Sequence, residues 1–240
     1  MSYKTELHLH TALVSPCATM MPEEIVELYI KAGYTCVVVS DHFCSYVIDH
    51  AGAIWQQKID HYLSGYRRMK AYAKDRLNVL LGCEFRLTCA INDYLIFGMT
   101  EEFLYTHPNI HQLPRLDHFR AYTVENNMLI VQAHPFRPTM EIVPPSFLDG
   151  VEVFNATPKY AGYNMIADIW AKKHGLIRTS GSDFHSKDHP IAGGIITDEP
   201  ITSTEQLVEV LRSGDYTLIC EGPAAEKEGL SSMPARYDQN

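Results

Sequence analysis

Residues 35–42 read Thr-Cys-Val-Val-Val-Ser-Asp-His, a mostly β-branched run that ends in a carboxylate and an imidazole. Such a run is typical of a strand buried on both faces, as in a parallel sheet. Four other patches follow or close apolar runs in the same way: His8-Leu9-His10, Glu84, His134-Pro135 and Asp183-Phe184-His185. The ends of parallel strands meet at one mouth of an α/β barrel. The sequence therefore predicts an α/β fold with a polar site at its strand ends.

Strand and helix patterns alternate along most of the chain. Strands are predicted at residues 5–10, 35–40, 79–83, 94–97, 129–132, 151–154, 176–179 and 216–219. Helices are predicted at residues 22–32, 55–74, 116–125 and 163–174, and a last one opens at the capping box Ser203…Gln206. This alternation predicts a single-domain α/β barrel over residues 1–220, with crossovers between parallel strands. Residues 221–240 are rich in Gly, Pro, Ser and charge, and are predicted to be a loosely held tail.

Composition sets outer limits on function. The 240 residues are 46% hydrophobic, enough for one large core. No apolar run approaches the ~20 residues of a membrane span, and the start lacks the features of a signal peptide. The six cysteines form no CxxC, so we expect reduced thiols in a cytoplasmic protein. A net charge of −9 argues against extended nucleic-acid binding, but not against a small phosphorylated substrate.

The residue types at the strand ends point to metal chemistry. Neutral imidazole and carboxylate are the ligands of hydrolytic zinc, manganese and iron sites. Residues two apart in a strand face the same side, so His8 and His10 can share one ion. Adjacent Asp41 and His42 face apart, so we assign the ligand role to His42 and an optional or supporting role to Asp41. The set predicts a multi-metal hydrolase.

The motifs also resemble a known family. The matching stretches are Leu7-His8-Leu9-His10-Thr11, Val39-Ser40-Asp41-His42, Leu81-Gly82-Cys83-Glu84, Ala133-His134-Pro135, Val151-Glu152-Val153-Phe154-Asn155 and Gly181-Ser182-Asp183-Phe184-His185. In this order they resemble the PHP family (polymerase and histidinol phosphatase), metal-dependent phosphoesterases on a distorted (β/α)7 barrel. The resemblance spans nearly the whole chain.

The resemblance implies two to three clustered divalent ions. His8, His10, Glu84 and Asp183 would hold the first; Glu84 would bridge to the second, which His134 also binds; and His42 and His185 would hold the third. The chain departs from the family twice. Where relatives often carry an acid or His after HxH, Cys17 is the nearest candidate ligand. Where another His often precedes Ile96-Phe97-Gly98, Asp93 stands as a carboxylate substitute.

Other polar residues have plainer interpretations. Arg137 could hold phosphate through a bidentate fork, or be an ordinary loop arginine. Arg86 and Lys159 are further phosphate candidates, and Glu152 and Asn155 either line the pocket or close a strand. Structural or surface roles are predicted for the remaining histidines: His50, His61, His107, His111, His118, His174 and His189. Tyr160 and Tyr163 are expected to pack.

These observations favour hydrolysis of a phosphate ester by metal-activated water. His42, His185 or a metal-bound water would protonate the leaving group, and Asp183 completes the catalytic set. One alternative is an amidohydrolase-like enzyme acting on amides or lactones, which would usually bridge its ions with a modified lysine. Another is a non-catalytic metal-binding or polymerase-accessory module, which lost ligands would support.

Overall fold

The structure is a computed structural model that describes residues 2–236. Its strands are β1 (Tyr3–Leu9), β2 (Tyr34–Val39), β3 (His42–Phe43), β4 (Asn78–Leu81), β5 (Cys83–Phe85), β6 (Tyr94–Phe97), β7 (Leu129–Gln132), β8 (Gly150–Asn155), β9 (Ile177–Gly181), β10 (Ile195–Thr197), β11 (Thr217–Leu218) and β12 (Met233–Pro234). Its helices are α1 (Pro22–Lys31), α2 (Ser45–Ile48), α3 (Trp55–Tyr62), α4 (Ser64–Ala73), α5 (Glu101–Thr106), α6 (Leu116–Glu125), α7 (Asn164–His174), α8 (Thr204–Ser213) and α9 (Gly222–Glu228).

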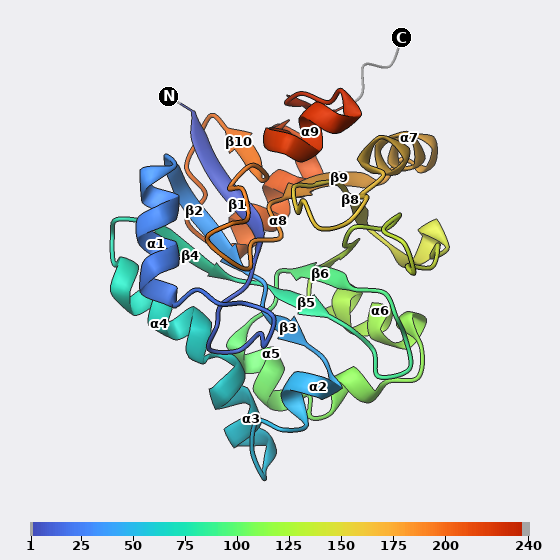
Figure 1. Ribbon diagram of the computed structural model, residues 1–240. Coiled ribbons are helices and arrows are strands. Elements are labelled where there is room, and N and C mark those ends of the chain that lie inside the picture. Colours follow the sequence, from blue (N-terminus) through green and yellow to red (C-terminus); the bar gives the residue numbers. More distant parts are fainter. Residues whose placement is uncertain (1, 237–240) are drawn as a thin grey trace.

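The strands form two six-stranded sheets (Figure 1). The first has the order β12-β11-β10-β1-β2-β4, with β1, β2 and β4 parallel and the others antiparallel. The second has the order β3-β5-β6-β7-β8-β9, in which β6 runs antiparallel to both neighbours. The predicted mixed α/β class is confirmed.

The antiparallel β6 departs from the predicted alternation of parallel strands. Residues 86–93 connect β5 to β6 without a helix. A short connection of this kind can join antiparallel strands, whereas parallel neighbours need a longer crossover. The length of that connection in the sequence is the physical reason for the reversed strand.

The chain passes from the first sheet into the second at two places, from β2 into β3 and from β4 into β5. Backbone hydrogen bonds tie these passages together: Gly82 N donates to Val39 O at 3.0 Å and Glu84 N to Ser40 O at 3.1 Å. On the other side of β1, Phe184 N donates to His8 O at 3.2 Å and His10 N to Phe184 O at 2.9 Å. The ends of β1, β2 and β9 therefore meet at the junction between the sheets.

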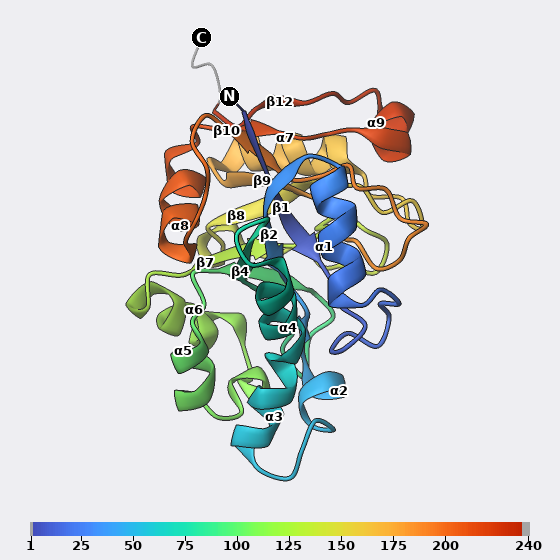
Figure 2. The same cartoon turned by 90° about the vertical axis from the view of Figure 1, so that its left-hand side faces the viewer.

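Helices lie around the outside of the two sheets (Figures 1 and 2). Helices α1 and α4 pack side by side beside β2 and β4, as Figure 2 shows from the left of Figure 1, and α7 packs on β8. The core between these layers includes fully buried Leu7, Leu9 and Ile96. Burial of such aliphatic side chains is the main stabilising contribution to the fold.

Two predicted elements differ from the structure. The single helix expected at residues 55–74 is divided into α3 and α4 at Leu63, although Leu63 N still donates to Ile59 O. Short strands β3, β10 and β12 were not predicted, because two or three residues carry too little periodicity to identify a strand.

The segment expected to be a loose tail is ordered up to residue 236. It forms α9 and then β12, which pairs with β11, and Ala235 is buried. The buried Arg178 donates from Nη1 to Pro234 O at 2.8 Å and to Ala235 O at 3.2 Å. Local composition does not reveal this tertiary contact. Residues 237–240 of the predicted tail lie outside the described residues.

Two sequence expectations concern surroundings rather than fold. None of the helices in residues 2–236 combines the length and apolar character that crossing a membrane requires. All six cysteines are free.

Candidate metal centre

Side chains from four strands meet at one carboxylate, that of Glu84. His8 lies in β1 and His10 just beyond it, His42 opens β3, Glu84 is the middle residue of β5, and His134 follows β7. All of these side chains are buried except His42, whose side chain is 20% exposed. The predicted convergence of these strand ends is therefore present in the structure.

The two oxygens of Glu84 face different imidazoles. Glu84 Oε1 lies 3.4 Å from His8 Nε2 and 3.1 Å from His134 Nε2. Glu84 Oε2 lies 3.4 Å from His10 Nε2 and 2.7 Å from His42 Nδ1. A carboxylate that lies among four imidazoles in this way can be shared between ions.

Asp183 closes the site from the end of β9. Its Oδ1 lies 3.3 Å from His8 Nε2 and 3.5 Å from His10 Nε2. The residue has a φ of +50°, a left-handed conformation that Asp tolerates better than most residues. This turn places the carboxylate and His185, two residues later, in the same cluster.

Several of these atoms have no hydrogen-bond partner among the described residues. His8 Nε2 and His10 Nε2 are buried and have no hydrogen-bond partner. A buried polar atom without a partner costs about 1–3 kcal/mol, so such atoms call for an explanation. The potential ligand atoms of His8, His10 and Glu84 lie within 4.8 Å of one another, as do those of His42, Glu84 and Asp93. The residues present fit divalent ions.

The carboxylates are ionised despite their burial. Burial by itself would raise the pKa of the Glu84 carboxyl, but nearby His42 and His8 outweigh it and hold the pKa well below its usual range. Burial also opposes ionisation of Asp183, but His8 and His10 lead the contacts that keep its pKa well below normal. The cluster thus offers the negative charge that divalent cations bind.

His8 and His10 differ in their surroundings. Burial disfavours the charged form of His8, but Asp183 and two glutamates raise its pKa well above its usual value. Burial lowers the pKa of His10 well below its usual value, and the neighbouring His185 and His42 act in the same direction. His10 is therefore neutral, the form of imidazole that binds a metal.

Glu152 supports the ligands from behind. Its Oε1 lies 2.9 Å from His8 Nδ1, and its Oε2 accepts from His134 N at 2.9 Å and from Asn155 Nδ2 at 2.8 Å. Holding Nδ1 in this way leaves His8 Nε2 for an ion. Glu152 is 1% exposed, so the structure places it behind His8 rather than on the pocket wall.

Asp41 also lies behind the ligands. Its Oδ1 accepts from Thr11 N at 2.7 Å and from Ser15 Oγ at 2.6 Å, and Oδ2 accepts from Thr11 Oγ1 at 2.8 Å. Ser15 Oγ in turn lies 3.2 Å from His10 Nδ1. Asp41 therefore orients His10 through Ser15, which agrees with a supporting role. The sequence does not reveal this role of Ser15, because Ser15 lies in an irregular loop.

Asp93 lies at the edge of the cluster. Its Oδ2 is 4.0 Å from His134 Nε2, and both carboxylate oxygens accept from Arg86 at 2.6 and 2.7 Å. Arg86 thus pairs with a candidate ligand. Its guanidinium is engaged at this carboxylate, although the residue also lines the adjoining cavity.

Cys17 contacts the remaining two histidines. Burial opposes ionisation of its thiol, but hydrogen-bonding contacts with His185 and His42 lower its pKa to about 6. His185 Nδ1 lies 2.8 Å from Asp183 O. The potential ligand atoms of His10, His42 and His185 all lie within 4.8 Å of one another.

Arg137 is tied to the cluster. Its Nη2 donates to Asp183 Oδ2 at 2.7 Å and to Asn155 Oδ1 at 3.2 Å. Its guanidinium carbon lies 4.9 Å from the centre of the Tyr160 ring, and Lys159 Nζ lies 5.1 Å from the same ring. Tyr160 is half-exposed, so it does not pack into the core as predicted.

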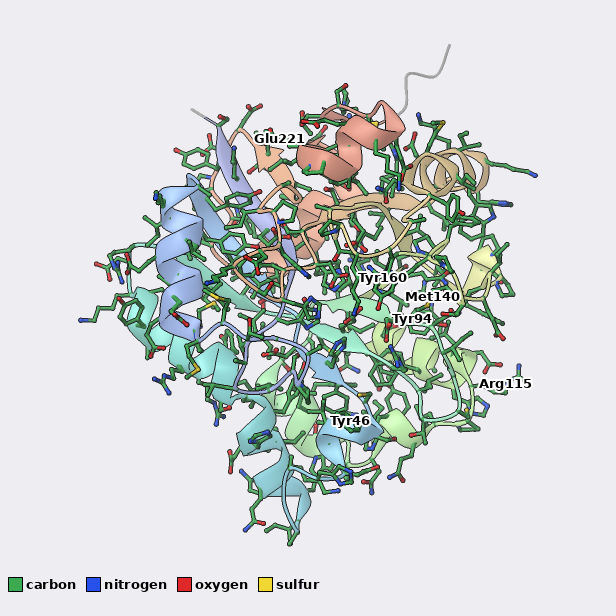
Figure 3. All side chains as sticks on the ribbon, viewed as in Figure 1. Tyr46, Tyr94, Arg115, Met140, Tyr160 and Glu221 are labelled. Carbon is green, nitrogen blue, oxygen red and sulfur yellow. The ribbon has the colours of Figure 1, made fainter. Side chains whose placement is uncertain are left out.

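A cavity of about 650 Å³ opens over the cluster. Ligand candidates Glu84, His134 and Asp183 form part of its wall, as do Tyr160 and Met140, which Figure 3 labels. His189, predicted to be structural or surface, also lines it and approaches Asp183 O with Nδ1 at 3.2 Å. The only indication of this position in the sequence is that His189 follows His185 by four residues, which is a weak signal.

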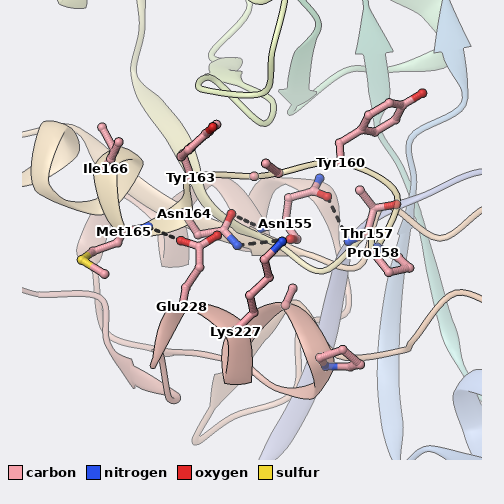
Figure 4. A pocket seen from close by; sticks show the side chains of 14 residues that line it. Asn155, Thr157, Pro158, Tyr160, Tyr163, Asn164, Met165, Ile166, Lys227 and Glu228 are labelled. Atoms are coloured by element: carbon pink, nitrogen blue, oxygen red, sulfur yellow. Dashed lines mark hydrogen bonds between the residues drawn. The ribbon is translucent and has the colours of Figure 1, made fainter.

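A second cavity, of about 490 Å³, lies beyond the loop that carries Tyr160 (Figure 4). Its walls come from that loop, from the start of α7 with Met165 and Ile166, and from α9 with Lys227. Asn155 lines this cavity rather than the first one. None of the predicted metal ligands lines it, so the larger cavity is the one adjoining the metal candidates.

Comparison with known proteins agrees with this geometry. Residues 6–216 match the PHP domain family. No curated protein sequence matches the chain closely enough to count as a relative.

Solved structures show the same fold at low identity. One is a two-domain protein from Bacteroides vulgatus that contains a predicted PHP-like metal-dependent phosphoesterase. It has a TM-score of 0.66 and 14% sequence identity, and the match covers 92% of this chain and 65% of that one. This chain therefore spans less than two thirds of the length of that protein. Another is a proposed metal-dependent phosphoesterase from Bifidobacterium adolescentis. It has a TM-score of 0.53 and 16% sequence identity, and the match covers 88% of this chain and 96% of that one. A third is an amidohydrolase from Chromobacterium violaceum, solved with sulfate and no metal. It has a TM-score of 0.52 and 14% sequence identity, and the match covers 87% of this chain and 96% of that one.

Proposed function

Because the chain belongs to the PHP domain family, we propose that it hydrolyses a small phosphate ester with two or more divalent ions, zinc, manganese or iron, held at the strand ends. The observation that carries this proposal is the position of Glu84. Its carboxylate lies within 3.4 Å of four imidazoles, which include His8 and His10, assigned below to the first ion, and His134, assigned to the second. Two-metal sites of this kind suit displacement at phosphorus.

Within this proposal the two sheets together correspond to the distorted seven-stranded barrel of the family. The passages from β2 to β3 and from β4 to β5, with the hydrogen bonds between Phe184 and β1, support that correspondence. The site would then lie at the mouth where the strand ends meet.

We assign the first ion to His8, His10, Glu84 and Asp183, and the second to Glu84, His134 and Asp93. Bound ions would lower the pKa of water and neutralise phosphoryl charge. Asp41 and Glu152 would keep the imidazoles of His10 and His8 in the orientation that binds, since each acts on Nδ1 and leaves Nε2 for the ion.

The cavity wall supplies the remaining groups. Arg137 is anchored to Asp183 through Nη2, and we assign the rest of its fork to a phosphoryl oxygen. Lys159 at the rim is a further cationic group for the substrate. The leaving alkoxide needs a proton or a cation, and we assign this task to the side of the cavity formed by His42 and His185.

The test is activity against a substrate panel. Phosphate monoesters, a phosphodiester, amides and lactones are assayed with metal-analysed protein, before and after treatment with a chelator. We expect turnover of phosphate esters alone and its loss on chelation. Turnover of amides or lactones instead would favour the amidohydrolase alternative. No turnover of any class, with ions bound, would favour the non-catalytic alternative.

A matched pair of variants links activity to the bridge. Glu84→Gln keeps the shape but removes the charge that lies among the four imidazoles. We expect it to lower kcat by more than ~100-fold, because losing a mere supporting partner of a metal ligand already costs about 10–100-fold. His61→Ala, at an exposed position, is the control and should keep wild-type kinetics. Equal losses in the two variants would contradict the assignment of Glu84.

A further inference from the structure

The second cavity, of about 490 Å³, has mostly apolar walls. Its volume lies within the range of roughly 300–1,000 Å³ that is typical of small-molecule pockets, which are lined mainly by apolar and aromatic side chains. Figure 4 shows α7 on one side of this cavity and α9 on another. The apolar side chains of the wall include Tyr160, Tyr163, Met165, Ile166, Pro223 and Ala224. The cavity therefore has the size and lining of a ligand site.

Large apolar side chains of this wall are exposed to solvent. Each of the following has 46–48% of its surface exposed: Tyr160, Tyr163, Met165 and Ile166. Helix α7 buries Ala167 in the core, but the apolar positions before it, Tyr163 and Ile166, lie outside the core. Contiguous apolar surface that the core does not use is typical of a binding site.

Polar groups of the cavity hold its wall together. Asn164 Oδ1 accepts from Asn155 N at 3.1 Å, and Asn164 Nδ2 donates to Asn155 O at 3.4 Å (Figure 4). Glu228 Oε2 accepts from Met165 N at 2.9 Å, which fastens α9 to the start of α7. Because these groups are engaged with each other, the wall offers a ligand mainly apolar and aromatic contacts.

The second cavity adjoins the one over the metal centre. Thr157 and Tyr160 line both cavities. The guanidinium carbon of Arg137 lies 4.9 Å from the centre of the Tyr160 ring, and Arg137 Nη2 donates to Asn155 Oδ1 at 3.2 Å. A phosphoryl group held by Arg137 would therefore lie close to the residues that the two cavities share.

We propose that the second cavity binds the ester group of the substrate, and that this group is an apolar chain carrying an aromatic ring. This inference rests on the proposed function, because it names the class of phosphate ester that the centre hydrolyses. Tyr160 and Tyr163 supply aromatic faces and edges for the ring, and burial of its apolar surface supplies affinity. The phosphate stays at the ions and Arg137, so this cavity selects the substrate without taking part in the chemistry.

The experiment compares two alkyl phosphates whose alcohol leaving groups have similar reactivity. Ethyl phosphate is too short to reach beyond the first cavity, whereas phenylpropyl phosphate carries a ring that can enter the second. The ratio of their kcat/KM values therefore reports on the second cavity. With metal-loaded full-length protein we expect a preference of about 10-fold or more for phenylpropyl phosphate, mainly through a lower KM, because the ring is buried.

A matched pair of variants on α7 locates the effect. Ile166→Asn makes the wall polar without adding a charge, and the side chain it replaces is 48% exposed, so the fold should be retained. We expect this variant to lose most of the preference for phenylpropyl phosphate. Ile169→Asn is the control, because Ile169 is 60% exposed on the same helix but does not line the cavity. It should keep the preference and both kcat/KM values.

The outcomes separate this inference from the proposed function. Hydrolysis of both esters by the wild type without a preference would overturn the inference and leave the proposed function standing. Equal loss of preference in the two variants would overturn it too, because the effect would then belong to the whole exposed face of α7.

If neither ester is hydrolysed, calorimetric binding of phenylpropylphosphonate, which lacks the ester bond, decides. Binding that Ile166→Asn weakens and Ile169→Asn does not would support the role of the cavity and contradict only the proposed function. Absence of both binding and hydrolysis would contradict both proposals.

Discussion

Arg137 carries two tasks that substitutions can separate. It fixes Asp183 through Nη2 and lines the cavity over the cluster. Burial disfavours its charge, but Asp183 raises its pKa above the usual value, so the side chain stays cationic. Replacing the forked guanidinium of Arg137 with the single ammonium of a lysine should affect phosphate binding. Removing the charge altogether should also affect the proposed metal ligand Asp183.

We predict that Arg137→Lys raises KM with metal content intact, because it keeps the charge but loses the bidentate fork. Arg137→Ala should be worse and should also lose bound metal, since Asp183 loses its partner. The cost of a charge-assisted bond, about 1.5–3 kcal/mol, corresponds to about a 10- to 100-fold fall in kcat/KM. The measurement is steady-state kinetics of each variant together with its bound metal content. Arg115→Lys, at an exposed position, is the control. Wild-type kcat/KM in both variants would make Arg137 an ordinary loop residue.

His111 is a buried histidine outside the site. Its ring stacks on Trp55 with centres 6.2 Å apart, and its Nε2 lies 3.1 Å from Asp49 Oδ1. Burial lowers the pKa of His111, and Asp49 offsets only part of that effect. The unfolded chain thus binds this proton more readily than the folded protein.

The sign of the pH effect follows directly. As pH falls below about 6.5, the unfolded chain gains the proton first, so the free energy of unfolding decreases. We predict that His111→Gln, which keeps a donor for Asp49, flattens this dependence by no more than about 1.4 kcal/mol per pH unit. Denaturant unfolding between about pH 7.5 and 5.5 measures it. His118→Gln, at an exposed position, should follow the wild type. Parallel curves for wild type and His111→Gln would refute the prediction.

At the scale of elements, α4 supports the site through a glycine. A Cβ on Gly65 would lie 2.3 Å from Thr11 Oγ1 and 2.8 Å from Asp41 Oδ2. The helix therefore packs its backbone directly against the carboxylate that orients His10 through Ser15. Only glycine permits this approach.

The effect of Gly65→Ala on the free energy of unfolding tests this contact. In an ordinary helix interior the substitution stabilises by about 0.5–1 kcal/mol. Here we predict destabilisation by about 1–3 kcal/mol, as expected for an overpacked contact, together with reduced activity. Thermal or denaturant unfolding with a kinetic assay measures both. A more stable and fully active Gly65→Ala would mean that α4 does not hold Asp41 in place.

The sequence predicted the bounds of several elements correctly. β6 and β7 have the expected bounds, and so does α6. It also predicted that His8, His10, Glu84, His134 and Asp183 would lie together, because residues two apart on a strand share a face and strand ends converge. It could not identify Ser15 or Gly65, since their roles arise from contacts across space. Nor could it identify β12, which depends on pairing with β11 and on Arg178.

At the scale of the whole molecule, the site depends on the junction of the two sheets. His8 and His10 come from the first sheet, whereas Glu84, His134 and Asp183 come from the second. The residues proposed to hold the first ion therefore come from both sheets. Whatever separates the sheets should therefore remove the metal centre together with the fold, and bound metal should stabilise the folded chain by mass action.

The central claim is that Glu84 bridges two ions, and anomalous diffraction from crystals grown with zinc or manganese tests it most directly. The account predicts two peaks about 3.5–4 Å apart, with one Glu84 oxygen on each and with His8, His10, His134 and Asp183 as ligands. Crystals of Glu84→Gln grown in the same metal should lose at least one peak. A single ion in the wild-type protein, or two ions of which neither contacts Glu84, would contradict the account.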